Sequence, residues 1–191
     1  MKTLIMAAGL GMLSLNAYSA DWQVSNQGSR VNFISIKKGD IAEVHHFSQV
    51  SGTLSDAGAF SLSIPLNSVV TNVEIRDQRM KEVLFDTAQY PSVELSASLD
   101  GQAIDKASVG SIMSMSVDAK VSLHGKAQTM PVMVSVAKVA SDKLMVASEA
   151  PLVVNAGDFG LTPGVEKLRE LAGLPAISKA VPVSFVLTLK R

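Results

Sequence analysis

Apolar and polar residues alternate along most of the chain, and the alternation is longest over residues 111–124. Every second residue of that stretch is apolar: Met113, Met115, Val117, Ala119, Val121 and Leu123. The residues between them are mostly polar and include Asp118, Lys120 and His124. Because successive side chains of a strand point to opposite faces, this pattern predicts a long β-strand with one buried and one solvated face.

The same period of two recurs in shorter segments on both sides of this strand. The clearest lie at 60–64, 93–99, 132–136 and 183–189, and further strands are expected around 31–36, 41–47, 50–54 and 144–153. Turn-forming residues separate them, as in Asp100-Gly101 and Ser141-Asp142. About eight or more short strands with one apolar face each predict an all-β fold, an antiparallel sandwich or barrel.

Two segments break the alternation and have the spacing of short amphipathic helices. Thr162-Pro163 is typical of a helix start, with the hydroxyl as N-cap and proline in the first turn. A helix over 163–172 then places Val165 and Leu168 on one face and ends at Gly173. A second half-helix is expected over 77–84, after a strand-like stretch at 68–75. Both helices would lie across an end of the barrel or against its wall.

The first residues have the order of a secretory signal peptide. A basic start at Lys2 is followed by an apolar run from Leu4 to Leu15 and then by small residues. Cleavage after Ser19 places Ala17 three residues back, and cleavage after Ala20 is the alternative. We therefore expect a leader over 1–19, one mature domain over 20–191 and a periplasmic location, with a buried N-terminal helix as the competing interpretation. The apolar run is too short for a comfortable membrane span.

Composition excludes several classes of chemistry. The 191 residues contain no cysteine and have a formal net charge of zero. A disulfide framework, a thiolate metal site and a thiol nucleophile are therefore excluded, and no basic patch indicates nucleic acid as a partner. We also expect no cofactor. The oligomeric state is open, with a homodimer as one option.

The candidate catalytic and metal-binding groups are sparse. His45 and His46 would point to opposite faces of a strand, and Glu43 would share a face with His45. Two ligands do not make a zinc site, so we expect no metal. His124, at a strand end, is expected to be solvated. No Gly-x-Ser-x-Gly motif marks a serine nucleophile, which leaves Asp77 and Asp86 as the carboxylate pair for acid–base work.

Two further features have both a structural and a ligand-binding interpretation. Arg76 and Asp77 could cap the half-helix or form ion pairs, or Arg76 could meet a polar ligand head at a cavity mouth. Met113 and Met115 could be core filler, since methionine adapts to irregular gaps. They could also line a cavity, because a closed barrel of about eight strands is just wide enough to hold one apolar ligand.

A series of short motifs resembles the YceI-like family of lipid-binding proteins. The series begins at Trp22, Ser29-x-Val31-x-Phe33 and Val50-Ser51-Gly52, and continues through Arg76-Asp77-x-x-Met80, Phe85-Asp86, Tyr90-Pro91, Leu123-x-Gly125 and Asp158-Phe159-Gly160. The resemblance covers essentially the whole mature chain. It implies an exported lipocalin-like antiparallel β-barrel with one or two short helices, and a polyisoprenoid or quinone-type lipid in an apolar tunnel.

The chain departs from the family pattern at two places. Thr162-Pro163 and the helix behind it precede the last strand, which makes this helix a candidate lid. Lys126 follows Gly125 where many members carry threonine.

The resulting hypothesis is a binding protein, not an enzyme, that carries a long isoprenoid lipid or quinone inside the barrel. The cavity is expected to be lined by Phe33, Phe47, Phe60, Leu62, Met80, Phe85, Leu95, Met113, Met115, Val117, Val134 and Phe185. Arg76, Asp77 and Asp86 are the polar residues for a head group or for structural pairs, Arg76 having Asp77 or Asp86 as its expected companion. The alternatives are an enzyme that acts on a small lipid-like substrate through Asp77, Asp86 or a histidine, and a packed structural envelope-stress protein.

Overall fold

The computed structural model describes residues 21–191, so the expected leader over 1–19 and its cleavage site lie outside the described residues. Eleven strands form one sheet in which every pair of neighbours is antiparallel. They are β1 (Trp22–Lys37), β2 (Ile41–Phe47), β3 (Ser51–Leu54), β4 (Ala59–Pro65), β5 (Val69–Val70), β6 (Ser92–Ser98), β7 (Ile112–Leu123), β8 (Lys126–Ala140), β9 (Lys143–Ser148), β10 (Leu152–Asn155) and β11 (Ala180–Lys190).

The sheet closes on itself because β11 also pairs with β1. The closed ring runs β1-β3-β4-β6-β7-β8-β9-β11 and returns to β1. This is an eight-stranded antiparallel barrel, and the expected fold class is confirmed.

Both closing strands change partners along their length. The first residues of β1 pair with β3, whereas Val31 to Lys37 pair with β2 after an irregularity between Ser25 and Arg30. In the same way β11 pairs with β9 over Val186–Lys190 and with β10 over Ala180–Val183. The barrel therefore opens at the end where β2 and β10 flank β1 and β11, and helical segments fill that end.

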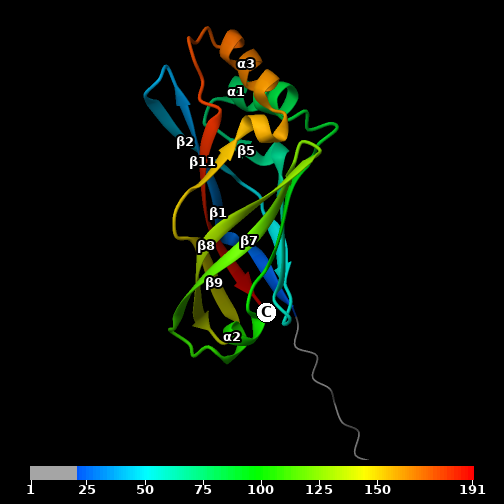
Figure 1. The fold of residues 1–191 in the computed structure, drawn as a ribbon. Helices are drawn as coiled ribbons and strands as arrows, with labels where there is room; N and C mark the ends of the chain where they lie inside the picture. The colour runs from blue at the N-terminus through cyan, green and yellow to red at the C-terminus, as the bar shows by residue number, and fades with distance from the viewer. Residues whose placement is uncertain (1–20) are drawn as a thin grey trace, which may run out of the picture.

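The helical segments gather mainly at this end of the barrel, which we call the helical end (Figure 1). They are the 3₁₀ helix η1 (Leu66–Ser68), α1 (Glu74–Arg79), the π-helix η2 (Met80–Leu84), the 3₁₀ helix η3 (Ala156–Phe159) and α3 (Thr162–Leu171), while α2 (Gly101–Lys106) lies at the opposite end. Gly164 lets α3 lie directly on η2, because a Cβ at this position would come within 3.0 Å of the Leu84 Cα.

The helices differ from the sequence-based expectations in three respects. The half-helix begins at Glu74 rather than 77, so the expected strand at 68–75 shrinks to the two residues of β5. Helix α2 replaces an expected turn, and its N-cap is Asp100, whose side chain accepts a hydrogen bond from the Ala103 N–H at 2.9 Å. Thr162 is not an N-cap, because the buried Leu161 already occupies that position and accepts a hydrogen bond from the Val165 N–H.

The expected strand at 144–153 is divided into β9 and β10 by the segment 149–151, which contains Pro151. The alternation over 111–124 is confirmed, since Val117, Ala119, Val121 and Leu123 of β7 are buried and the residues between them are more exposed. The expected end of the 163–172 helix at Gly173 is also confirmed, because α3 ends at Leu171 and Gly173 has a φ of 63°.

The buried side chains form two clusters along the barrel axis. The lower cluster surrounds Leu54, Val136, Leu144 and Leu187 between the strands of the closed ring. The upper cluster, at the helical end, surrounds Leu66, Phe159, Leu161 and Val165 and includes Met80 and Phe85. The cavities inside the barrel are lined by residues of these two clusters.

Candidate lipid-binding cavity

An apolar cavity of about 180 Å³ lies inside the barrel at the helical end. We call it the upper cavity. It is lined only by apolar residues, which come from eight strands and from the helical segments that cover them. The lining includes seven residues expected from the sequence: Phe33, Phe47, Leu62, Met80, Phe85, Leu95 and Phe185.

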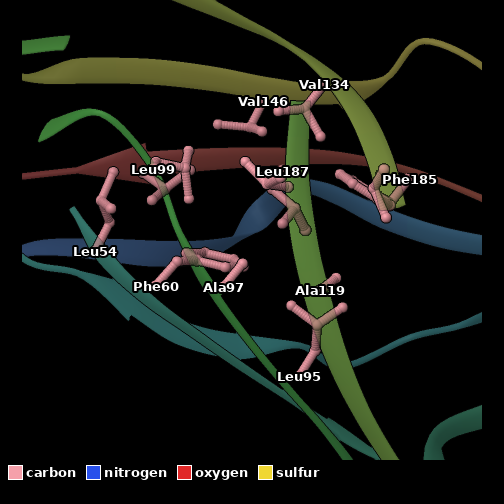
Figure 2. A pocket seen from close by; sticks show the side chains of 13 residues that line it. Leu54, Phe60, Leu95, Ala97, Leu99, Ala119, Val134, Val146, Phe185 and Leu187 are labelled. Atoms are coloured by element: carbon pink, nitrogen blue, oxygen red, sulfur yellow. The ribbon is translucent and has the colours of Figure 1, made fainter. Parts of the chain in front are cut away.

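A second, smaller cavity of about 30 Å³ lies deeper in the barrel, and we call it the lower cavity (Figure 2). Its lining is also entirely apolar. It includes the expected residues Phe60, Val117 and Val134, together with Leu95 and Phe185, which line both cavities. Leu54 and Leu99 lie at the end of this cavity that faces away from Phe185.

Two of the expected lining residues, Met113 and Met115, line neither cavity. Both are half-buried and pack against the lower cluster. Met113 pairs across the strands with Val136, which is completely buried, so this part of the barrel is filled by side chains. Contact of any of the twelve residues with a ligand stays a prediction.

Several lining residues were not among those expected. Leu84 of η2, Leu161, and Val165 of α3 close the upper cavity from the helical end, and Val154 and Val183 line its wall. The helical spacing of Val165 and Leu168 was visible in the sequence, but a spacing shows only that one face is apolar. It does not show that this face covers a cavity.

Aromatic rings form one side of the upper cavity. The ring centroids of Phe33 and Phe47 are 5.4 Å apart, and those of Phe47 and Phe85 are 6.4 Å apart. The Phe33 ring also lies 5.2 Å from the His45 ring. Tilted rings at these separations pack favourably beyond the area they bury. This aromatic group joins β1 and β2 to the residue that follows η2.

His45 is the one polar member of this aromatic neighbourhood. Its side chain is only 3% exposed, and its Nε2 lies 2.8 Å from the Ser35 Oγ, whereas Nδ1 has no hydrogen-bond partner among the described residues. Burial lowers the pKa of His45 below its ordinary value of 6.5, and the charge of Arg76 lowers it further. The imidazole is therefore held in its neutral form.

Arg76 links the start of α1 to the β1–β2 hairpin. Its Nη1 donates to the Glu43 carboxylate at 2.6 Å, and its Nη2 donates to the Thr71 carbonyl at 2.7 Å. Lys37 contacts the other oxygen of Glu43 at 2.9 Å. The hydrogen bond from Lys37, with the contribution of Arg76, holds the pKa of Glu43 below its ordinary value. The Nε atom of Arg76 is buried and, within residues 21–191, has no partner.

Arg76 therefore pairs with Glu43, and the prediction that Asp77 or Asp86 is its companion was wrong. Asp77 instead accepts hydrogen bonds from the backbone N–H of Thr71, at 2.8 Å, and from the Thr71 hydroxyl. Asp86 lies in a turn with a φ of 47°, where its carbonyl accepts from the Tyr90 N–H at 2.8 Å. Asp77 and Asp86 thus have separate structural contacts rather than one shared site.

The remaining predictions concern the histidines and metal binding. His124 is half-buried, and its ring stacks on Tyr90 at 4.3 Å, so the expectation of a solvated side chain was wrong. His45 is buried while its neighbour His46 is only partly covered, as the opposite faces of β2 require. In the part of the chain described here, no three potential metal-ligating side chains gather. Nor is any helix of residues 21–191 long and apolar enough to cross a membrane.

Comparison with known proteins agrees with this architecture. The chain matches the family described as YceI-like domain over residues 22–189. A polyisoprenoid binding domain from Saccharophagus degradans shares 37% sequence identity and superposes with a TM-score of 0.87. This comparison covers 88% of the present chain and 97% of the other. No curated protein sequence matches the chain.

Two more distant structures share the fold. BcnA from Burkholderia cenocepacia is 19% identical, with a TM-score of 0.66 over 86% of this chain and 98% of that one. A YCEI protein from Campylobacter jejuni is 11% identical, with a TM-score of 0.54 over 100% and 99% of the two chains. At these identities the likeness concerns the fold alone.

Proposed function

The chain belongs to the YceI-like domain family, and from this premise we propose that it binds an isoprenoid lipid inside its barrel. The observation that carries the proposal is the upper cavity, about 180 Å³ in volume and walled only by apolar side chains. The similar Saccharophagus degradans protein, a polyisoprenoid binding domain at 37% identity, supports the choice of lipid class.

The binding energy in this proposal comes from removing the chain of the lipid from water. Each CH₂ group transferred to an apolar environment contributes about 0.8 kcal/mol. An isoprenoid chain therefore binds firmly without any polar contact, while aliphatic walls distinguish such chains by length and shape rather than by chemistry. An apolar cavity of about 150 Å³ is enough for one benzene molecule. The upper cavity thus holds a ring or a short branched segment, and a longer chain needs additional space.

We place the polar head of the lipid at the helical end. The two buried side-chain polar atoms without a partner among residues 21–191, Nδ1 of His45 and Nε of Arg76, belong to residues near this end that stand behind the apolar lining of the upper cavity rather than in it. A buried donor that gains a hydrogen bond avoids a desolvation cost of about 1–3 kcal/mol. Hydroxyl and quinone carbonyl oxygens can both accept such a bond, so an isoprenoid quinone is the second ligand class in this proposal.

The proposal is binding without chemical conversion. No titratable side chain lines either cavity of the described barrel, so the enclosed part of a ligand meets neither an acid nor a base. The carboxylate of Asp77, one of the acid–base candidates from the sequence, accepts two hydrogen bonds from Thr71. Sequestration or carriage of a lipid requires only the enclosed apolar space.

Native mass spectrometry of protein purified from its own host tests this function directly. We expect a bound species of several hundred daltons, and the same spectrum reports whether the protein is a monomer or a homodimer. Val183→Trp fills the upper cavity and should remove the bound species, with a loss of stability of about 1–3 kcal/mol from overpacking.

Val186→Trp is the matched control for this experiment. Val186 lies three residues further along the same strand and is 40% exposed, so the variant should keep the bound species. A wild-type protein that carries no lipid and takes up none from vesicles of isoprenoid alcohol and phospholipid would contradict the proposal.

A further inference from the structure

The space inside the barrel consists of two cavities that meet at one level along the barrel axis. The upper and lower cavities have different linings, and Leu95 and Phe185 are the two described residues that belong to both. Above this level the lining includes Phe33, Phe47 and Val183, and below it Phe60, Val134 and Leu187. The two shared residues therefore mark the boundary between the cavities.

These two residues stand on opposite sides of the barrel. Leu95 lies on β6 and Phe185 on β11. Between β6 and β11 the closed ring contains β7, β8 and β9 in one direction and β4, β3 and β1 in the other. Three strands on either side make these walls diametrically opposed, and side chains from both can approach across the barrel axis. Figure 2 shows the two residues on different walls of the lower cavity.

Neither side chain is fully buried, although both pack against the lower cluster. Leu95 and Phe185 are half-buried although both face the interior of the barrel, whereas the neighbouring Leu187 is 1% exposed. For a residue that faces inward, this exposure is free space in the cavities. Both side chains therefore have room to change rotamer, which most core side chains lack.

The lower cavity is much smaller than the upper one. Its volume of about 30 Å³ is a sixth of that of the upper cavity, and Leu54 and Leu99 close the end away from Phe185. Trp22, which pairs with Leu54 across the strands, is 2% exposed, and the Arg191 guanidinium lies 4.1 Å from the centre of its ring. The lower cavity thus has bulky side chains at its far end, and it adjoins the upper cavity at Leu95 and Phe185.

We propose that Leu95 and Phe185 form a neck that limits the length of the isoprenoid chain the barrel accepts. The inference rests on the proposed function, because it assigns a role to residues within the same cavity. With its head at the helical end, a chain extends down the barrel axis toward the neck. A short chain ends above the neck, and a longer one reaches the lower cavity only when these two side chains turn aside.

The test measures the affinity of a series of isoprenoid alcohols: geraniol, farnesol, geranylgeraniol and solanesol. Wild-type affinity should rise with chain length and then level off once the chain meets the neck. Phe185→Ala and Leu95→Ala join the two cavities, and we expect each to bind the alcohols beyond that point at least about tenfold more tightly than wild type. Their affinity for geraniol should change less than about threefold, because each additional buried carbon contributes affinity only where space exists for it.

Val186→Ala is the matched control, because Val186 follows Phe185 on β11, is 40% exposed and lines neither cavity. It should level off at the same chain length as wild type. Phe60→Ala enlarges only the lower cavity and leaves the neck in place, so it should shift that length less than Phe185→Ala. Phe185→Leu, which keeps an apolar side chain in the neck, gives an intermediate shift and serves if Phe185→Ala does not fold.

The outcomes separate this inference from the proposed function. If wild type binds the alcohols and the neck variants rank them as wild type does, the neck inference is overturned and lipid binding stands. The neck inference is also overturned, and lipid binding retained, if Phe60→Ala shifts the accepted length as strongly as Phe185→Ala. If wild type binds none of the four alcohols, the proposed function itself is contradicted, and the neck with it.

Discussion

Among single residues, His45 has a pKa that its burial in the fold lowers. The side chain is buried between Phe33 and the polar contacts of Arg76 and Glu43, with Ser35 as its hydrogen-bond partner. Burial and the charge of Arg76 lower its pKa, while the charges of Glu43 and Asp77 act in the opposite direction. The net effect makes the folded protein a poorer proton acceptor at this site than the unfolded chain.

His45 should therefore make folding stability depend on pH below neutrality. Its unfolded-state pKa is about 6.5, and the folded-state pKa lies lower, so the unfolded chain binds the additional proton as pH falls. The contribution of the neutral imidazole is complete above pH ~7, declines as pH falls through about 6.5, and levels off below the folded-state pKa. We expect His45→Gln to reduce the loss of stability between pH 7.5 and 5 in urea unfolding.

Val44→Gln is the control for that measurement. Val44 precedes His45 on the exposed face of β2, and neither valine nor glutamine titrates, so this variant should keep the wild-type pH dependence. Equal slopes for wild type and His45→Gln would contradict the assignment. Glu43 contributes at lower pH, because its pKa is lowered by Lys37 and Arg76 and its stabilising effect disappears as pH falls through that lowered value.

The polar residues also show where sequence reasoning ends. Arg76 and Asp77 were visible as candidates, and a buried guanidinium needs a partner, but the partner came from a position 33 residues earlier in the chain. That pairing depends on the β1–β2 hairpin folding back over α1, which no local pattern specifies. Local alternation did predict that Glu43 and His45 share a face of β2.

At the scale of elements, the contact between α3 and η2 controls the cover of the upper cavity. Leu161 and Val165 point into this cavity, and Gly164 lies against the backbone of η2. A hydrogen bond from Arg79 to the Leu171 carbonyl at 3.2 Å ties the other end of α3 to α1. Helix α3 is therefore held near its start by the contact of Gly164 with η2 and at its end by the hydrogen bond from Arg79.

Gly164→Ala should accelerate lipid release several-fold. The new Cβ would lie 3.0 Å from the Leu84 Cα and 3.1 Å from the Val83 carbonyl oxygen, so α3 must move away from η2. The gain of about 1 kcal/mol from alanine in a helix offsets part of the strain, so overall stability should change by less than about 1 kcal/mol. Release is measured by transfer of a fluorescent isoprenoid to vesicles.

Gly157→Ala is the matched control, because its Cβ would meet nothing nearer than the Thr162 hydroxyl at 3.5 Å. This variant should release lipid at the wild-type rate. A wild-type rate for Gly164→Ala as well would show that lipid leaves by a route that α3 does not cover.

The elements themselves were predictable to different degrees. The strands of the ring follow from alternation, because each has one face in the apolar interior and the other in solvent. The division of 144–153 into β9 and β10 was not predicted, because both parts keep the apolar period while they pair with different lengths of β11. The π-helix η2 and helix α2 are too short for periodicity to reveal. The cavity was predicted from its strand residues, whereas its helical cover required the three-dimensional packing.

At the scale of the whole molecule, export is a prediction that rests on the first residues alone. The basic start, the apolar run and the small residues before Asp21 predict a cleaved leader, and a periplasmic location is proposed on that basis. Intact mass or N-terminal sequencing of the exported protein should give Ala20 or Asp21 as its first residue. Leu10→Arg, which interrupts the apolar run, should leave the precursor uncleaved. A wild-type protein that keeps Met1 and stays in the cytoplasm would contradict the prediction.

The pairing of β1 with β11 has a consequence for the order in which the molecule assembles. The two strands that close the ring, β1 and β11, stand at opposite ends of the described residues, so the ring has two unpaired edges until β11 has docked. Pairing between such distant segments is slow, and open strand edges invite association with other chains. Val183 and Phe185 belong to β11, so the wall of the upper cavity is completed when β11 pairs with β1. A lipid present when the barrel closes can therefore be enclosed without crossing a finished wall.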